Sequence, residues 1–250
     1  MPAIGFGTWN LSEDGEVQRA VSEALEVGYR LIDTAKIYRN ERGVGEAIRA
    51  SGIKRQEILV TTKLWPGDFG YDSALAAFDA SLAKLGLDYV DLYLMHWPGH
   101  SAQDRQDSWR ALERIYEEGR VKAIGVSNYG VEHLEEMAGA SVQPAVNQIE
   151  LHPFNYAEQV EVLEFCKRRE ILVEAYSPLN QGRGLDHPVL VEVASKYKKS
   201  PGQVMLRWAI QHGTVPIPKS AKPERIRENF AVFDFELLAE EMSAIDKLLQ

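Results

Sequence analysis

Short apolar runs alternate with longer amphipathic segments along the whole chain. In segments such as Val17–Val27 and Ala74–Leu85, apolar residues recur at the three- and four-residue spacing of a helix with one buried face. The short runs are rich in β-branched and aliphatic residues, which is typical of strands. This alternation predicts βα units and a parallel sheet. The expected strands are Ile4–Thr8, Leu31–Asp33, Leu59–Lys63, Val90–Met95, Ala123–Ser127, Ala145–Ile149, Leu172–Ala175 and Val215–Pro218.

Eight such units in 250 residues match the size of one α/β protein of the (β/α)8 or TIM barrel type. A doubly wound sheet would show the same alternation, but it usually carries a glycine-rich dinucleotide fingerprint after its first strand. Here the pairs Gly5–Gly7 and Gly43–Gly45 are followed by Asn10 and Ile48 where a third glycine is needed. We interpret these glycines as sites of close packing. Without a low-complexity linker or a shift in composition, we expect residues 1–250 to form a single domain.

Composition and charge narrow the class of protein. No apolar run approaches the roughly 20 residues of a membrane-spanning helix, and the first residues do not resemble a signal peptide, so we expect a cytoplasmic protein. A formal net charge of −9 argues against a general surface for nucleic acid or anionic membrane, and an anionic ligand would need a local basic pocket. The single cysteine, Cys166, lies in the helical-looking segment Val160–Arg169, and we expect an inert, partly buried thiol.

Polar residues stand where the expected strands end. Asp33 ends the second strand, Lys63 the third, His96 follows the fourth, and Tyr38 lies in the loop after Asp33. In such a barrel the active site forms at the carboxyl ends of the strands, and neighbouring strands lie only about 5 Å apart. Each residue alone has an ordinary explanation as a loop cap, a solvated strand end or a rim aromatic. An acid, a base, an imidazole and a phenol on consecutive units together favour a catalytic site.

The chemistry of these four residues is compatible with proton donation to a carbonyl oxygen. A phenol donates poorly near neutral pH, but a lysine ammonium beside Tyr38 would favour the phenolate and lower the pKa. Asp33, as a counter-ion, would keep Lys63 protonated. His96 would offer a directional hydrogen bond to the carbonyl oxygen of a substrate and hold it near the Tyr38 hydroxyl.

In these residues the sequence resembles the aldo-keto reductase family. The stretch from Asp33 to Glu41 (Asp-Thr-Ala-Lys-Ile-Tyr-Arg-Asn-Glu) is similar to the family's catalytic loop, Lys63 stands in its Thr-Lys-Leu-Trp context, and His96 in Leu-Tyr-Leu-Met-His-Trp-Pro. Further similar motifs run to Arg225-Ile-Arg-Glu-Asn229, so the likeness covers essentially the whole chain. The resemblance implies reduction of aldehydes and ketones with NADPH, with Tyr38 as the proton donor and Asp33, Lys63 and His96 assisting.

The resemblance also implies a set of contacts to the nicotinamide end of the cofactor. Ser127, Asn128 and Gln148 offer donors and acceptors for the carboxamide, and Tyr176 offers a face for ring stacking. An alternative stays open, in which Ser127–Asn128 only caps the next helix and Tyr176 only plugs the barrel mouth. The expected contacts at this end are Thr8, Ser127, Asn128, Gln148, Tyr176, Ser177 and Leu179.

A local basic cluster follows the last expected strand. Phosphate sites in these barrels commonly use this region, and Pro223 is placed to open a helix there. We expect Arg225 to bind the phosphate that distinguishes NADPH from NADH, and Glu228 and Asn229 to lie near the adenine. Because glutamates are interleaved, a solvated charged face is the alternative. The residues expected to bind this end of NADPH are Lys219, Ser220, Arg225, Glu228 and Asn229.

The sequence indicates less about the substrate, metal binding and oligomeric state than about the fold. We expect Trp9, Trp65, His96 and Trp97 to contact a small aldehyde or ketone. His96 and His100 are four residues apart, but Pro98 prevents a helix between them and no third ligand type completes a set, so we expect no metal.

Unlike many family members, this chain starts almost directly in the first strand and shows no long tail after the last helix. We therefore expect an open mouth that accepts varied small aldehydes, and a monomer is the family default.

Two other functions are compatible with parts of the pattern. In a Schiff-base aldolase, Lys63 would attack a carbonyl as a neutral amine, but the adjacent Asp33 would keep it charged. A structural or regulatory protein could retain the barrel and the cofactor without turnover.

Overall fold

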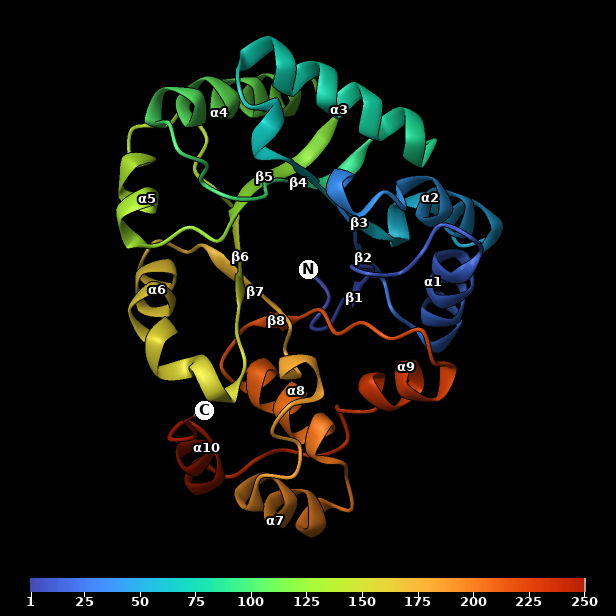
Figure 1. Cartoon of the computed structure of the whole chain (residues 1–250), viewed down its shortest axis with the longest axis vertical. Helices are drawn as coiled ribbons and strands as arrows, with labels where there is room; N and C mark the ends of the chain where they lie inside the picture. Colours follow the sequence, from blue (N-terminus) through green and yellow to red (C-terminus); the bar gives the residue numbers. More distant parts are fainter. Residues whose placement is uncertain (250) are drawn as a thin grey trace.

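Eight parallel strands form one sheet whose spatial order follows the chain in a computed structural model that describes residues 1–249 (Figure 1). The backbone N–H groups of Gly5 and Gly7 donate to the carbonyl oxygens of Pro216 and Pro218, at 2.9 and 3.1 Å. These bonds join the first strand to the last, and the fold is the expected (β/α)8 barrel. The strands are β1 Phe6–Gly7, β2 Leu31–Asp33, β3 Leu59–Leu64, β4 Val90–Met95, β5 Val121–Ser127, β6 Val146–Glu150, β7 Leu172–Tyr176 and β8 Val215–Pro216.

A ring of helices packs around the sheet, and two parts of the chain contribute more than one helix per strand (Figure 1). Helices α7 and α8 both lie between β7 and β8, and α9 and α10 both follow β8. The helices are α1 Glu16–Val27, α2 Glu41–Ala50, α3 Tyr71–Leu85, α4 Ala102–Glu117, α5 Val131–Glu136, α6 Tyr156–Arg168, α7 Pro188–Tyr197, α8 Pro201–Gln211, α9 Pro223–Phe230 and α10 Ala239–Ile245. Short 3-10 helices are η1 Lys36–Tyr38, η2 Arg55–Glu57, η3 Pro66–Asp68, η4 Pro153–Asn155 and η5 Asn180–Gly182.

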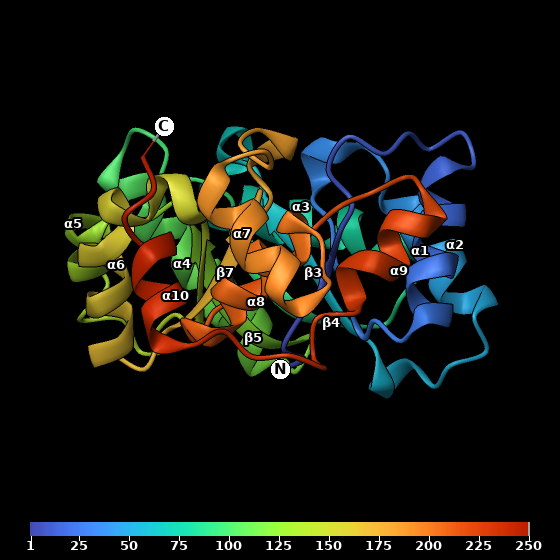
Figure 2. The ribbon, with the colours of Figure 1, turned by 90° about the horizontal axis from the view of Figure 1, so that it is seen from below.

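The barrel interior is divided into an apolar floor and a polar layer. Leu31 and Leu172 pack in the floor, and the residues two positions further along the same strands, Asp33 and Glu174, are buried above them. Because side chains two apart share one face of a strand, the polar layer lies nearer the carboxyl ends. In Figure 2 the amino terminus of the chain lies at one edge of the barrel and the carboxyl-terminal segment reaches the other.

The glycine pairs serve close packing, as expected. A Cβ on Gly7 would lie 2.9 Å from the carbonyl oxygen of Ile217, the segment that pairs with β1. A Cβ on Gly45 in α2 would overlap the backbone of Leu85 in α3. These positions exclude a larger side chain for steric reasons.

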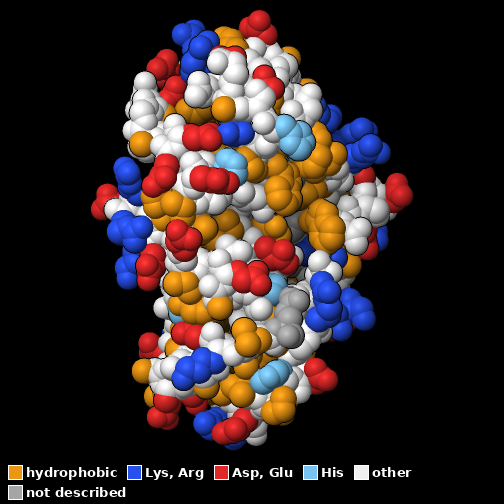
Figure 3. Space-filling view, turned by 60° about the vertical axis from the view of Figure 1, so that its left-hand side comes forward, with side chains coloured by type: hydrophobic (Ala, Val, Ile, Leu, Met, Phe, Trp, Pro, Cys, Tyr) orange, Lys and Arg blue, Asp and Glu red, His pale blue; other side chains and the backbone are white. Residues whose placement is uncertain are grey.

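Within residues 1–249, no helix is both long enough and apolar enough to cross a lipid bilayer. On the face shown in Figure 3, acidic and basic side chains are interspersed with hydrophobic ones. Cys166 in α6 is buried, and burial raises the pKa of its thiol. A lower thiolate fraction means lower reactivity, in agreement with an inert cysteine.

Candidate active site

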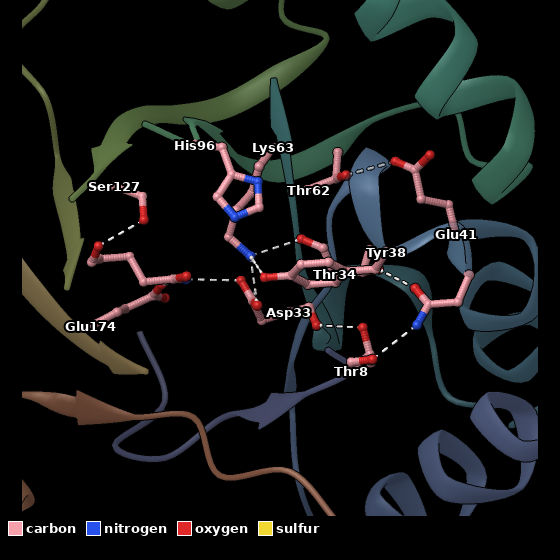
Figure 4. Close-up of polar contacts among 12 residues, drawn as sticks. Thr8, Asp33, Thr34, Tyr38, Glu41, Thr62, Lys63, His96, Ser127 and Glu174 are labelled. Carbon is pink, nitrogen blue, oxygen red and sulfur yellow. Dashed lines mark hydrogen bonds and ion pairs between the residues drawn. The ribbon is translucent and has the colours of Figure 1, made fainter. Parts of the chain in front are cut away.

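A buried lysine links the ends of β2 and β3 to the loop that carries Tyr38 (Figure 4). Lys63 Nζ lies 2.7 Å from Asp33 Oδ1, and it donates to the Thr34 carbonyl oxygen at 3.0 Å and to the Tyr38 hydroxyl at 3.4 Å. Lys63 is fully buried, and Asp33 is 2% exposed. The structure therefore brings together three of the residues predicted from the sequence, with the ammonium between carboxylate and phenol.

The loop after β2 is anchored by a residue that the sequence did not single out. The buried Asn40 accepts a hydrogen bond from Thr34 Oγ1 at 2.8 Å and donates from Nδ2 to the Thr8 carbonyl oxygen at 2.9 Å. Thr8 in turn donates its hydroxyl to the Asp33 carbonyl oxygen at 2.9 Å. These bonds fix η1, and with it Tyr38, against β1 and β2. In this structure Thr8 supports the strand end, and its contact with a cofactor remains a prediction.

Burial and charge determine the protonation states of Tyr38 and Lys63. Burial raises the pKa of the Tyr38 phenol, and the Lys63 ammonium partly opposes this. The lowered pKa predicted from the sequence for Tyr38 is therefore wrong, because removal of the phenol from water has the larger effect. For Lys63, burial favours the neutral amine, yet Asp33 and Tyr38 favour the ammonium more strongly and the pKa is raised. At neutral pH the site thus holds a protonated phenol beside a charged lysine.

His96 completes the group at the end of β4. Its ring makes edge-to-face contacts with Tyr38 at 5.7 Å and Trp65 at 5.4 Å between ring centroids. Burial lowers the pKa of His96 to about 3, and the charge of Lys63 acts in the same direction. The imidazole is therefore neutral at neutral pH and can donate one hydrogen bond without carrying a charge.

A second buried carboxyl group, Glu174, lies on the other side of Asp33. Gln148 Nε2 donates to Asp33 Oδ2 at 2.9 Å and to Glu174 Oε2 at 2.7 Å, which links β2, β6 and β7 across the barrel (Figure 4). Burial raises the pKa of Glu174 to about 7, and the negative charge of Asp33 adds to the effect. Glu174 is not among the site residues predicted from the sequence. The available signal was a single charged residue at an inward-facing position of the apolar strand β7.

The ends of β5 and β7 present further polar groups. Ser127 Oγ donates to the Gln148 carbonyl oxygen at 2.8 Å, and Asn128 Nδ2 donates to Ser127 Oγ at 3.0 Å. The Tyr176 hydroxyl donates to Asn128 Oδ1 at 2.8 Å. Asn128 and Ser177 have left-handed backbone angles, with φ of 62° and 48°. Ser127, Asn128, Gln148 and Tyr176 thus form one connected group, while Leu179 lies half-buried beyond it.

The predicted phosphate region lies at the start of α9. The Ser220 hydroxyl accepts from the backbone N–H of Lys222 at 3.1 Å, and Lys219 and Arg225 are exposed. No ion pair among residues 1–249 involves Lys219, Lys222 or Arg225, whereas Arg227 contacts Glu23 at 2.6 Å. Lys219, Lys222 and Arg225 therefore have charge available for an anion.

The rest of α9 contacts α8. Glu228 accepts a hydrogen bond from the Ser200 hydroxyl at the start of α8, and Asn229 is buried. Both residues lie on the helix that begins at the cationic cluster. Glu228 is therefore partly engaged within the protein, and its contact with adenine remains a prediction.

The predicted substrate residues differ in exposure. Trp9 is 53% exposed and Trp97 44%, whereas Trp65 is half-buried against His96. Trp9 and Trp97 therefore have indole surface available to a ligand. Within residues 1–249 there is also no group of three histidine, cysteine or carboxylate side chains placed to hold a metal ion.

Residues 3–250 match the sequence profile of the Aldo/keto reductase family. The chain belongs to the aldo/keto reductase family. It is 52% identical over 252 residues to a 9,11-endoperoxide prostaglandin H2 reductase of Trypanosoma cruzi, covering 99% of this chain and 88% of that protein. It is 50% identical over 249 residues to the glyoxal reductase of Bacillus subtilis, covering 99% and 89%. A crystal structure of an aldo/keto reductase from Brucella melitensis is similar with a TM-score of 0.94 at 51% identity, covering 99% and 95%.

Membership confirms the resemblance seen in the sequence and establishes the general activity. This aldo/keto reductase is an oxidoreductase, and its family acts on carbonyl compounds with a nicotinamide cofactor. The polar layer at the carboxyl ends of its strands is accordingly the candidate active site.

Proposed function

We propose that this aldo/keto reductase reduces aldehydes and ketones to alcohols with NADPH, and that Tyr38 donates the proton. The observation that carries the proposal is the position of the Lys63 ammonium, within hydrogen-bond distance of both Asp33 and the Tyr38 hydroxyl. A proton donor to a forming alkoxide needs a group that stabilises the conjugate base left behind, and Lys63 meets that need.

The chain's own residues can perform the proton transfer. When bound, NADPH supplies a hydride to the carbonyl carbon. Tyr38 gives its phenolic proton to the carbonyl oxygen, and Lys63 stabilises the resulting phenolate by charge and hydrogen bonding. Asp33 keeps the buried Lys63 protonated, and the neutral imidazole of His96 orients the carbonyl oxygen.

The connected polar group at β5, β6 and β7 fits the nicotinamide carboxamide. Carboxylates only accept hydrogen bonds when ionised, so the two carboxyl partners of Gln148 turn its Nε2 toward them and leave Oε1 as an acceptor. Ser127 and Asn128 add hydroxyl and amide groups beside it. Tyr176, whose hydroxyl is held by Asn128, offers its ring face for stacking, while Thr8, Ser177 and Leu179 are proposed as further contacts.

We also propose that NADPH is preferred to NADH. An arginine can donate two N–H groups to one phosphate, and Arg225 lies in the first turn of α9, where the helix dipole adds to the attraction. Lys219 contributes a second charge and Ser220 a hydroxyl group. Glu228 and Asn229 on the same helix are proposed to lie near the adenine.

Small aldehydes are the proposed substrates. Trp9, Trp65 and Trp97 supply apolar surface around His96, which suits compact carbonyl compounds. One relative at 50% identity is a glyoxal reductase, so glyoxal is a suitable first probe.

One experiment separates this proposal from the two alternatives. NADPH is titrated into the purified protein while its fluorescence is followed, and glyoxal is then added while absorbance of the cofactor is recorded. A reductase binds NADPH and oxidises it only after the aldehyde arrives. An aldolase would ignore the cofactor and be trapped on Lys63 by borohydride, and a structural protein would bind NADPH without oxidising it.

A further inference from the structure

Glu174 is a fully buried ionisable group that the proposed proton transfer does not use. It lies in β7, where its register neighbours are Gln148 on β6 and Val215 on β8. Its Oε2 accepts a hydrogen bond from Gln148 Nε2, and its Oε1 has no hydrogen-bond partner among residues 1–249. A glutamate in such surroundings is costly to bury, and no packing requirement explains the choice of a carboxyl group over an apolar side chain.

The polar layer contains one more carboxyl group than cation. Asp33 is matched by Lys63 at 2.7 Å, whereas Glu174 has no cation within ion-pair distance among the described residues. The charged groups that act on Glu174 are Asp33 from β2, which opposes ionisation, and Lys63 from β3, which favours it. Gln148 from β6 hydrogen-bonds to it, and Val215 from β8 is apolar. Ionisation of Glu174 is therefore less favoured than that of a buried carboxyl group paired with a cation.

Gln148 connects this carboxyl group to the proposed nicotinamide site. Its two Nε2 hydrogens are divided between Asp33 and Glu174, and this fixes the amide plane. The remaining oxygen is the group assigned above to the nicotinamide carboxamide. Gln148 is therefore a side chain through which Glu174 can act on a bound nicotinamide.

We propose that Glu174 is a positioning residue for the nicotinamide: it holds the Gln148 amide in place, and its negative charge favours the oxidised, positively charged ring over the reduced, neutral one. The inference rests on the proposed use of a nicotinamide cofactor by Gln148. Because Glu174 has a pKa of about 7, its charge changes near neutral pH. Above this pH the carboxylate attracts the NADP+ ring, and below it the neutral carboxyl group does not.

The predicted observable is a pH-dependent ratio of two affinities. As the pH rises from about 6 to about 8, the ratio of the dissociation constants of NADP+ and NADPH should fall about two- to fivefold in the wild type. The 2′-phosphate ionises in both cofactors, so its effect cancels in the ratio. Tyr38 and Lys63 have raised pKa values and His96 a pKa of about 3, so these groups keep their charge in this range.

Two variants separate the charge from the hydrogen bond. Glu174→Gln keeps an acceptor for Gln148 but has no charge, so it should bind NADPH within about twofold of the wild type and show a ratio that no longer changes with pH. Glu174→Leu has a similar volume but no acceptor, so NADPH affinity should fall about five- to tenfold. Glu164→Gln, on the exposed side of α6, removes the same charge far from the site and should keep the wild-type pH dependence.

The outcomes are distinguishable. A ratio in Glu174→Gln that still falls with pH as in the wild type, or full NADPH affinity in Glu174→Leu, would overturn the inference. If Glu174→Leu does not fold, as shown by its circular dichroism, the pH profile of Glu174→Gln alone decides. If the wild type binds neither cofactor, the proposed function fails instead.

Discussion

At the scale of single residues, the site depends on ions removed from water. Lys63 is fully buried, and burying a single ammonium costs several kcal/mol unless other groups compensate. Its compensation comes from the Asp33 carboxylate, the Thr34 carbonyl oxygen and the Tyr38 hydroxyl. Removing any of these partners leaves a buried charge incompletely solvated. Position and protonation state of Lys63 are thus set by the same contacts.

Because of His96, the free energy of unfolding is expected to decrease as the pH becomes acidic. Its pKa is about 3 in the folded protein and 6.5 in the unfolded chain, so the unfolded chain binds the proton more readily between these values. The stabilising effect of the neutral ring is complete above about pH 6.5 and is lost as the pH falls toward 3. In the wild type, this titration should lower the free energy of unfolding by on the order of 2 kcal/mol between about pH 7 and about pH 4.5. His96→Gln should remove this contribution, and urea unfolding at both pH values measures it. An unchanged loss in the variant would mean that His96 titrates normally in the fold.

Some site residues could be recognised from the sequence and others could not. Asp33, Lys63 and His96 follow strands that apolar patterning identifies, so their convergence follows from the barrel. Asn40 and Glu174 act through hydrogen bonds to residues distant in the sequence, such as Asn40 to Thr8 and Glu174 to Gln148. A charged residue within the apolar strand β7 is a weak sequence signal for Glu174, but a single sequence contains no signal for the partners of either residue.

At the scale of elements, the hydrophobic pattern located the six middle strands, β2 to β7, to within two residues. β2 and β4 have the expected bounds, and β3, β5, β6 and β7 differ by one or two residues. The first and last strands are shorter than expected, because Pro216 and Pro218 have no N–H to donate and offer only carbonyl oxygens to Gly5 and Gly7. The extra helices α7 and α10 were not distinguished, since each has the same helical period as its neighbour in the ring.

Packing between α2 and α3 depends on a glycine. A Cβ at position 45 would overlap the backbone of Leu85, which cannot move without displacing a helix end. Gly45→Ala should therefore lower the free energy of unfolding by about 1–3 kcal/mol. The control is Gly139→Ala, where a Cβ meets nothing within 4 Å. Thermal and urea unfolding of both variants measure the difference, and equal stability of the two would refute the close contact.

The first turn of α9 is predicted to select the cofactor. Arg225→Ala should weaken NADPH binding by about one to two orders of magnitude, since a hydrogen bond to a charged group is worth about 1.5–3 kcal/mol, and it should leave NADH nearly unchanged. Arg227→Ala, on the same helix but paired with Glu23, is the matched control and should bind both cofactors as the wild type does. Fluorescence titration measures the affinities of the wild type and both variants for the two cofactors. Equal weakening of NADH and NADPH would show that Arg225 does not recognise the phosphate.

At the scale of the whole molecule, the barrel brings together groups that are far apart in the chain. Gln148 contacts Asp33 across 115 positions of sequence, and Lys63 contacts Asp33 across 30. The closed sheet makes this possible because every strand ends at the same rim. The family could be identified from motifs along the whole chain, whereas the protonation states depend on burial that only the assembled barrel provides.

The most direct test of the account is carbonyl reduction by Tyr38→Phe. General acid catalysis is typically worth about 10²- to 10⁴-fold, so the variant should reduce glyoxal more slowly by a factor in this range while binding NADPH with nearly wild-type affinity. Tyr116→Phe, at an exposed position of α4, is the control and should match the wild type. If Tyr38→Phe oxidises NADPH with glyoxal within about a factor of two of the wild type, Tyr38 is not the proton donor and the account is contradicted.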